Sequence, residues 1–281
     1  MRGSFVSLAV VAMLASGRPC GAEDGVRRFD IASKATGARY VIEVVVPSGA
    51  PANGSKYPAV YCTDWFVLSD YLKSLPGLME MGRLAEPFVF VGISQEGGSA
   101  EWALARTRDF TPARPEDAYS KSNTFPGALE VAGGSARFVA FLRDELIPRV
   151  ESTYPVDPAR RGFLGYSLGG LLGVQILARE PQLFHDYLIG SPSVWFNDFV
   201  LGREVESAPA SSRSGIRRLY LSVGEEESWE MLKGYALVRD ALTRNGLDGP
   251  RLKAEVIADA GHVGGMPISL YNGLRFLYRR K

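Results

Sequence analysis

The feature that most constrains this chain is a regular alternation of short apolar runs with longer amphipathic stretches. The short runs are rich in β-branched and aromatic residues, and several are apolar throughout, as strands are when both faces of their sheet are covered. Strands that alternate with helices form a mostly parallel sheet, so we predict the α/β class. The predicted strands span residues 39–46, 57–62, 87–93, 161–166, 187–191, 217–223 and 252–257.

Helices are predicted between these strands from the spacing of apolar residues. Residues 135–153 carry large apolar side chains at roughly helical spacing, with Pro155 beyond the end. The other predicted helices span residues 168–179, 229–245 and 267–278. Residues 97–127 and 197–215 show no clear period, and connections of this length are usually functional or mobile.

The N-terminal residues have the features of an export signal. Arg2 supplies a positive charge, residues 5–15 are apolar, and a small-x-small cleavage site ends at Ala22. A membrane span needs ~20 apolar residues, so this run is too short to anchor the chain. We therefore expect residues 1–22 to be a signal peptide that is removed. Residues 23–281 would remain as one catalytic domain without a membrane span, secreted or periplasmic.

Charge and cysteine content narrow the class of partner. The 281 residues carry a net charge of +1 with acids and bases interspersed, whereas a nucleic-acid-binding protein would show a basic excess. We therefore expect a small-molecule partner, and the sequence carries no signal of oligomeric state. Once Cys20 leaves with the signal, Cys62 is the remaining thiol, so no intramolecular disulfide can form. Its apolar neighbours predict a buried cysteine.

Residues 165–169 form a G-x-S-x-G pattern with Ser167 at its centre. The pattern alone is weak evidence, but it follows an apolar strand-like run and opens into a predicted helix, which is the context of a nucleophile elbow. The flanking glycines leave room for a strained turn. The hydroxyl then projects at the N-terminus of a helix, where the helix dipole favours developing negative charge. We therefore predict that Ser167 is a nucleophile.

A nucleophilic serine needs a base that takes its proton, and this chain has two histidines. His262 follows both Ser167 and a strand that ends in acidic residues, which is the order serine, acid, histidine of elbow-type hydrolases. It lies in a glycine-flanked segment after the last predicted strand, where we expect a loop. His185 precedes a strand, and we expect it to be structural. The predicted base is therefore His262.

Three consecutive glutamates follow the strand that ends at Gly224. A carboxylate is needed here to orient the imidazole and to stabilise its charged form. In many hydrolases of this type the acid lies three residues after the glycine, which favours Glu227. Glu226 is the alternative, and Glu225 is a third candidate. The two glutamates that do not face the histidine would be solvated loop charges.

Four further segments carry a resemblance to known proteins. Residues 57–64 resemble a “YPVLYLLDG” strand and residues 106–112 an “R-x-x-D-Y-T-P” element, and residues 145–148 and 191–196 also fit. Together with the elbow, these motifs resemble the “Putative esterase” branch of the α/β-hydrolases. That branch includes esterase-D-like formylglutathione hydrolases, feruloyl esterases, mycolyl transferases and siderophore esterases. The resemblance implies an α/β-hydrolase fold, with a mostly parallel central sheet and helices on both faces.

The resemblance also implies an oxyanion hole made of two backbone amides. One is the amide of Leu168, and the other follows Asp64, where Phe66 is the closer match and Trp65 the alternative. Each such donor typically supplies ~3 kcal/mol of transition-state stabilisation. The chain departs from the family at Trp65, where glycine is common, and beside the serine at Tyr166 and Leu168. These departures bear on the substrate and not on the chemistry.

The predicted function is ester hydrolysis through an acyl-enzyme, in which Ser167 attacks the carbonyl carbon, His262 takes its proton and Glu227 orients His262. An acyltransferase or a thioesterase would use the same triad, and a non-catalytic binding protein could share the fold. No cofactor or metal is expected, because the chain has no H-E-x-x-H, no P-loop and no G-x-G-x-x-G after its first strand.

The predicted substrate-binding residues are aromatic or basic. We expect Trp65 and Trp195 to line an aromatic pocket, although rings of this kind also serve core packing. Arg106, with Arg108 as the alternative, would read an acidic or catechol group. Two further aromatic residues in these segments are Trp102 and Phe196. Such a pocket suits a catecholate siderophore ester or a feruloyl-type ester.

Overall fold

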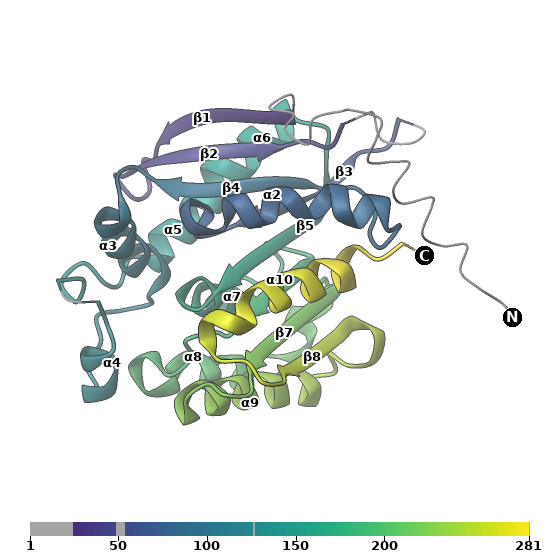
Figure 1. Ribbon diagram of the computed structural model, residues 1–281. Coiled ribbons are helices and arrows are strands. Elements are labelled where there is room, and N and C mark those ends of the chain that lie inside the picture. The colour runs from purple at the N-terminus through teal and green to yellow at the C-terminus, as the bar shows by residue number, and fades with distance from the viewer. Residues whose placement is uncertain (1–24, 49–53, 126, 281) are drawn as a thin grey trace, which may run out of the picture.

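The computed structural model describes residues 25–48, 54–125 and 127–280, which are built around one eight-stranded sheet (Figure 1). The strands are β1 Val26–Ala32, β2 Arg39–Val45, β3 Tyr57–Cys62, β4 Val89–Gln95, β5 Val156–Tyr166, β6 Asp186–Gly190, β7 Arg218–Gly224 and β8 Leu252–Ile257. Their order is β1-β2-β4-β3-β5-β6-β7-β8. β2 pairs antiparallel with β1 and β4, and the other neighbouring pairs are parallel. The predicted signal peptide, residues 1–22, lies outside the described residues.

The α/β class and the seven predicted strands are confirmed, with shifts at their ends. The sequence prediction missed β1, because Arg27, Arg28 and Asp30 interrupt the apolar pattern of this largely exposed edge strand. β5 begins at Val156 and not at residue 161, because its first half is polar and only partly buried. Apolar runs therefore located the covered strands and not the exposed edge.

The α-helices are α2 Trp65–Met81, α3 Ser99–Phe110, α4 Ala118–Ser122, α5 Ser135–Phe141, α6 Ile147–Thr153, α7 Leu168–Arg179, α8 Phe196–Ser207, α9 Trp229–Arg244 and α10 His262–Tyr278. The helix predicted over residues 135–153 is interrupted by a π-helical turn, Leu142–Leu146. Pro148 follows this turn, and a wider turn accommodates its missing N–H and its ring. α3, α4 and α8 lie in the two segments that showed no clear period. No helix within the described ranges is long and apolar enough to cross a membrane.

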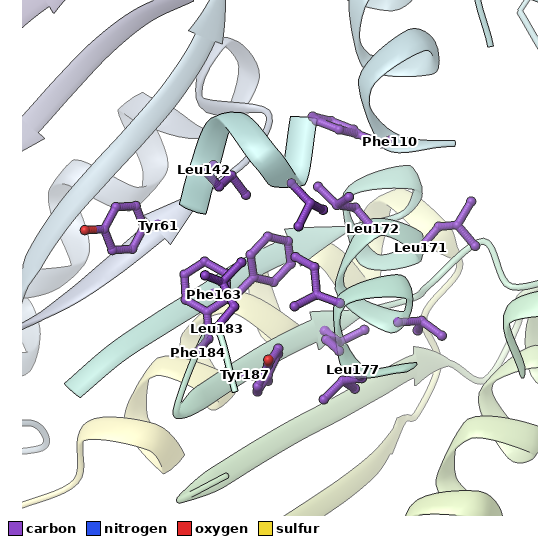
Figure 2. Close-up of a cluster of buried hydrophobic side chains, with 14 of the residues drawn as sticks. Tyr61, Phe110, Leu142, Phe163, Leu171, Leu172, Leu177, Leu183, Phe184 and Tyr187 are labelled. Atoms are coloured by element: carbon purple, nitrogen blue, oxygen red, sulfur yellow. The ribbon is translucent and has the colours of Figure 1, made fainter. Parts of the chain in front are cut away.

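The helices cover both faces of the sheet, and each face has its own cluster of buried apolar side chains (Figure 1). α2 and α10 cover one face, where Leu72 and Leu274 are fully buried. The other face carries α3 and α5 to α9, and Figure 2 shows its core, with Phe163 of β5 and Leu172 and Leu177 of α7 among its members. Each such buried leucine contributes ~2 kcal/mol. This packing fixes α7, and with it the turn that precedes the helix.

The carboxyl ends of the parallel strands meet at one edge of the sheet. The segments that leave this edge carry Asp64 after β3, Ser167 after β5, Ser191 after β6, Glu227 after β7 and His262, the first residue of α10, after β8. In open α/β sheets, ligands bind at this edge. The topology therefore gathers the predicted site residues from segments that are far apart in the sequence.

Candidate active site

Ser167 lies on the tight turn between β5 and α7, with φ 60° and ψ −118°. For a residue with a side chain, such a backbone conformation lowers the free energy of unfolding by about 1–3 kcal/mol. The glycines of the motif are required by space. A Cβ on Gly165 would lie 2.2 Å from the carbonyl oxygen of Gly169, and a Cβ on Gly169 would lie 2.4 Å from Oγ1 of Thr63. The turn has the geometry of a nucleophile elbow.

The N-termini of α2 and α7 lie side by side at this elbow, since a Cβ on Gly169 would also lie 3.2 Å from a carboxylate oxygen of Asp64. Asp64 has a left-handed backbone, φ 56°, and its carbonyl accepts the first two hydrogen bonds of α2, at 3.0 and 3.2 Å. The amides of Trp65 and Phe66 come before these donors, and the amide of Leu168 opens α7. First-turn amides have no acceptor within their own helix. They can therefore donate to an oxyanion, with the amide of Phe66 or of Trp65 as the donor from α2.

Glu227 joins His262 to the ends of two strands. Oε2 of Glu227 lies 2.6 Å from Nδ1 of His262. Oε1 accepts hydrogen bonds from the Ser191 hydroxyl at 2.5 Å and from the Gly224 amide at 2.9 Å. Burial raises the pKa of the Glu227 carboxyl, but the hydrogen bonds from these three donors outweigh burial and hold its pKa below the ordinary value. Glu227 is therefore an ionised carboxylate directed at the imidazole.

The three consecutive glutamates have different surroundings. Glu227 is buried, whereas Glu225 and Glu226 are exposed. Glu225 accepts a hydrogen bond from the Asp259 amide at 3.2 Å. The offset of three residues from Gly224 therefore identified the glutamate that contacts His262.

His262 is the first residue of α10 and does not lie in a loop as the sequence predicted. The glycines beside it are poor helix formers, and together with Pro267 they placed the predicted start five residues too late. The helical position fixes the backbone of His262. Its carbonyl accepts a hydrogen bond from the Tyr166 hydroxyl at 2.6 Å, and the rings of Tyr166 and His262 lie 5.2 Å apart. The residue before the serine thus positions the histidine.

Two cavities meet at Ser167. A cavity of about 220 Å³ is lined by Ser167, His262 and apolar residues of α2 and α10. A second cavity of about 330 Å³ is lined by Ser167, Ser193 and Trp195 together with residues 123–125. Oγ of Ser193 lies 3.5 Å from Oγ of Ser167. The serine hydroxyl is therefore accessible from both sides.

Arg106 lines both cavities, as a substrate-binding residue would, and its charge is paired within the protein; that it reads a substrate group stays a prediction. Its Nε and Nη2 donate to the two carboxylate oxygens of Asp64 at 2.9 and 3.0 Å. Nε1 of Trp102 donates to the same carboxylate at 3.0 Å, and the guanidinium lies 4.9 Å from the Trp102 ring centre. This bidentate pair holds the residue that opens α2. Arg106 therefore holds Asp64, the residue that precedes the predicted oxyanion donors of α2.

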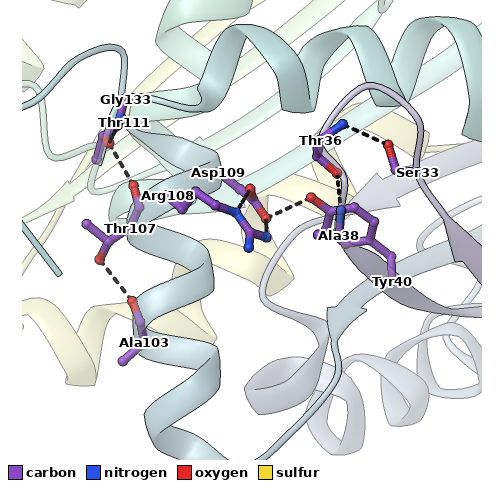
Figure 3. A network of polar contacts seen from close by, with 10 residues as sticks. All are labelled: Ser33, Thr36, Ala38, Tyr40, Ala103, Thr107, Arg108, Asp109, Thr111 and Gly133. Atoms are coloured by element: carbon purple, nitrogen blue, oxygen red, sulfur yellow. Dashed lines mark hydrogen bonds and ion pairs between the residues drawn. The ribbon is translucent and has the colours of Figure 1, made fainter. Parts of the chain in front are cut away.

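Arg108, the alternative to Arg106, lies in a separate network (Figure 3). It donates to the buried carboxylate of Asp109 at 2.7 and 2.8 Å, and the Tyr40 hydroxyl donates to the same carboxylate at 3.0 Å. This network ties α3 to β2. The prediction that Arg108 could read a substrate group is wrong, because its guanidinium is engaged there and lines neither cavity.

Trp65 does not line the site, and the prediction that its side chain binds substrate is wrong. Its side chain is 2% exposed, and its ring packs so closely on β4 that a Cβ on Gly92 would lie 2.0 Å from it. Nε1 of Trp65 donates to Glu43 at 3.0 Å. The ring belongs to the inward face of α2. Phe196, also predicted near the site, is 1% exposed and is likewise part of the core.

Trp195 is half-buried, lines the larger cavity and packs edge-on against Tyr119, with ring centres 5.4 Å apart. The sequence prediction missed Ser191, Ser193 and the apolar residues of the smaller cavity. The motif at 191–196 marked the first two, but only as a resemblance. The apolar residues carried no signal, because exposed valines and methionines are common on any helix.

Cys62, His185 and the other metal-ligating residue types were also located in the described part of the chain. Cys62 is fully buried, as predicted, and burial raises the pKa of its thiol well above the ordinary value. Over residues 25–48, 54–125 and 127–280, no group of three or more His, Cys, Asp or Glu side chains is arranged to hold a metal ion. His185 lies near the opposite ends of the strands, where its carbonyl accepts a hydrogen bond from Arg217.

Known proteins are similar to this chain in sequence and in architecture. A family model described as “Putative esterase” matches residues 33–233. The Bacillus subtilis (strain 168) protein “Ferri-bacillibactin esterase BesA” is 29% identical over 249 residues, covering 84% of each chain. “Siderophore hydrolase EstA” from Aspergillus nidulans is similar in structure, with a TM-score of 0.73 at 26% identity over 93% of this chain and 97% of that one.

A further solved structure bears on the fold alone. The BES protein from Bacillus cereus superimposes with a TM-score of 0.78 at 23% identity, covering 94% of this chain and 98% of its own. Together with the sheet order and the elbow, these similarities confirm the predicted α/β-hydrolase fold.

Proposed function

Because the chain belongs to the “Putative esterase” family and is an ester hydrolase, we propose that it cleaves a siderophore ester with Ser167, His262 and Glu227 as its catalytic triad. The observation that carries the proposal is the 2.6 Å contact between Nδ1 of His262 and the buried carboxylate of Glu227, beside a serine on an elbow. This contact leaves Nε2 of the imidazole to serve the serine hydroxyl.

The reaction proceeds in two halves. Oγ of Ser167 attacks the ester carbonyl carbon as Nε2 of His262 takes its proton, and Glu227 stabilises the resulting imidazolium. The imidazolium then gives this proton to the alkoxy oxygen, so the alcohol leaves and the acyl group stays on Ser167. In the second half, His262 activates water, which releases the acid and restores the serine.

The negative oxygen formed in each half is held by backbone amides. The amide of Leu168 is one donor, and the amide of Phe66 or of Trp65 is the other. Each contributes ~3 kcal/mol to transition-state stabilisation, because the donors are fixed before the charge develops. The Asp64–Arg106 ion pair supports this role, since it holds the left-handed residue at which α2 begins.

A siderophore ester is supported by the relatives and by the larger cavity. One similar protein is a siderophore hydrolase and another is a ferri-bacillibactin esterase. The cavity combines the rings of Trp195, Phe125 and Trp102 with the hydroxyls and amide of Ser193, Thr124 and Asn123. Rings beside hydrogen-bonding groups suit an acyl group that carries a catechol. A feruloyl-type ester has the same elements and is the comparison substrate in the test.

The test is hydrolysis of a catecholate trilactone, methyl ferulate and a short-chain nitrophenyl ester by the mature chain. Ser167→Ala and His262→Ala should each lower kcat/KM by a factor of about 10³ or more. Glu227→Gln should lower it roughly 10²- to 10⁴-fold. Its matched control is Glu226→Gln, which removes an exposed charge next to it and should change activity less than about twofold.

Two outcomes of this test would contradict the proposal. Full activity of Ser167→Ala or His262→Ala towards all three esters would show that these residues are not the catalytic triad. Slower cleavage of the trilactone than of methyl ferulate would show that a siderophore ester is not the preferred substrate. Far-UV circular dichroism and thermal unfolding of every variant show whether a loss of activity comes from loss of the fold.

The proposal includes a location outside the cytoplasm, as a secreted or periplasmic enzyme with residues 23–281 forming one catalytic domain. It is supported by the charged and apolar pattern of residues 1–22. Expression of the full chain should yield a shortened protein in the medium or periplasm, and deletion of residues 2–22 should retain it in the cytoplasm. Mass spectrometry of the exported protein gives the cleavage site.

A further inference from the structure

The two cavities that meet at Ser167 differ in their surroundings. The smaller lies between α2 and α10 and includes His262 with Val67, Val263 and Met266. The larger includes Ser193 and Trp195 of the loop after β6 and residues 123–125. Ser167, Trp102 and Arg106 line both, so the cavities adjoin each other at the nucleophile.

The proton that His262 carries decides which part of an ester enters which cavity. In the tetrahedral intermediate the former carbonyl carbon bears Oγ of Ser167, the negative oxygen, the alkoxy oxygen and the acyl chain. His262 must give its proton to the alkoxy oxygen, so that oxygen must face the imidazole. His262 lines the smaller cavity and not the larger one.

We infer that the leaving alcohol occupies the cavity between α2 and α10, and that the acyl group occupies the cavity beside Ser193 and Trp195. This inference rests on the proposed function, because it uses the roles of Ser167 and His262. It adds that two separate sets of residues determine specificity for the two halves of the ester.

The acyl cavity selects a ring with polar substituents. Ser193 is 3% exposed, its amide donates to the carbonyl of Ser167 at 3.1 Å, and its hydroxyl lies 3.5 Å from the nucleophile. This hydroxyl is thus fixed where the acyl chain leaves the carbonyl carbon. Tyr119 packs against Trp195 and holds it as a wall, and Phe125, 50% exposed, lies at the mouth.

The alcohol cavity selects an apolar and extended group. Beyond His262, the side chains that α2 and α10 contribute are hydrocarbon or thioether: Val67, Leu68, Val263 and Met266. Val67 is 49% exposed and Val263 is 77% exposed, so this side is open to solvent. An alcohol can therefore extend past His262 along an apolar surface, and a large remainder of the substrate can stay outside the cavity.

The two sets of residues should affect different steps, because the alcohol departs when the acyl-enzyme forms and the acyl group stays until deacylation. The test uses ethyl and decyl esters of 2,3-dihydroxybenzoic acid and of acetic acid. The measured quantities are kcat/KM and the rate constant for loss of the acyl group from Ser167, followed by rapid quench and mass spectrometry.

Val263→Ser should lower kcat/KM for both decyl esters roughly three- to tenfold relative to the ethyl esters, because it removes apolar contact with the alcohol. The deacylation rate constant should not change by more than about twofold. Val67→Ser, on the other helix, should give the same pattern. The matched control is Val256→Ser on β8, an exposed valine that lines neither cavity, which should have no effect.

Phe125→Ala should change specificity for the acyl half of the ester. It should reduce the preference for dihydroxybenzoyl over acetyl esters roughly three- to tenfold, with either alcohol, and should change the dihydroxybenzoyl deacylation rate. The opposite pattern, with Val263→Ser altering deacylation and Phe125→Ala responding to the alcohol, would overturn the assignment. So would the absence of any preference change in the folded variants.

The outcome is separable from the test of the proposed function. If Ser167→Ala remains active, the proposed triad fails and the cavities have no assigned nucleophile. If Ser167→Ala is inactive but the two cavity variants give the opposite pattern, the triad stands and the assignment of the cavities is wrong.

Discussion

Ser191 has a left-handed backbone, φ 38°, at a position where glycine would be free of strain. It is fully buried, and its hydroxyl donates to Glu227 at 2.5 Å. Such a backbone costs of order 1–3 kcal/mol in a residue with a side chain. Because glycine cannot supply a hydroxyl, the strain is explained by the need to hold the carboxylate that faces His262. Ser191 is therefore a positioning residue.

Two substitutions of Ser191 distinguish the effect of its hydroxyl from the effect of its strained backbone. Ser191→Gly should relieve the strain and leave the free energy of unfolding equal or slightly higher, while kcat falls about tenfold because Glu227 loses a donor. Ser191→Ala should show the same fall in kcat and no gain in stability. Urea unfolding and steady-state kinetics check both. A Ser191→Gly enzyme with wild-type kcat would show that the hydroxyl has no role in positioning.

Glu227 also links stability to pH. The folded state lowers the pKa of its carboxyl, so the ionised form favours folding. This contribution is present above the unfolded pKa of about 4.3 and is lost as the pH falls through the folded value. The free energy of unfolding of the wild type should therefore fall more steeply below about pH 4 than that of Glu227→Gln. Urea unfolding at several pH values measures this, and parallel profiles would contradict it.

At the scale of elements, the junction of α2 and α7 depends on glycine. Gly169→Ala would bring a Cβ to 2.4 Å from Oγ1 of Thr63 and force the two helix N-termini apart. We expect a loss of ~1–3 kcal/mol in the free energy of unfolding and a fall in kcat, because the oxyanion donors move.

The matched control for this prediction is Gly77→Ala in α2. Gly77 has open space around it, so alanine should stabilise the helix by about 0.5–1 kcal/mol and leave kcat unchanged. Thermal unfolding with activity assays distinguishes the two variants. Equal effects of both substitutions would show that the contact with Thr63 does not matter.

The same elements show which parts of the site can be predicted from sequence. Ser167 and His262 could be, because a glycine-bounded serine after an apolar run and a scarcity of histidines are local signals. Glu227 followed from an offset along one loop. The Asp64–Arg106 pair could not be predicted, because it joins residues 42 positions apart, one at the start of α2 and the other on α3.

The sequence also did not show which aromatic side chains are buried in the core. Trp65 and Trp195 are the same residue type beside similar motifs, yet one lies in the core and the other lines a cavity. The difference arises from which side of a helix or loop faces the sheet, and α2 was not predicted. Strands were located because two-sided burial makes them apolar, and β1 was missed because it is exposed.

At the scale of the whole molecule, Cys62 reports on global opening. It lies on the central strand β3 and is fully buried, and burial raises the pKa of its thiol. In the mature chain we expect no reaction with a thiol reagent unless the sheet unfolds, and no effect of reductant on thermal stability. Labelling rates followed across urea concentrations check this. Rapid labelling under native conditions would show that β3 opens locally.

The position of His262 at the start of α10 has a consequence for how the enzyme is made. α10 also supplies Leu270, Leu274 and Leu277 to the core that covers one face of the sheet. During synthesis or export Ser167 emerges long before this helix, so an incomplete chain holds Ser167 without His262, beside a part of the sheet that α10 does not yet cover. With His262 as the proposed base, we therefore expect hydrolytic activity to begin only when the last helix docks, and an unfinished chain to leave esters intact along its route.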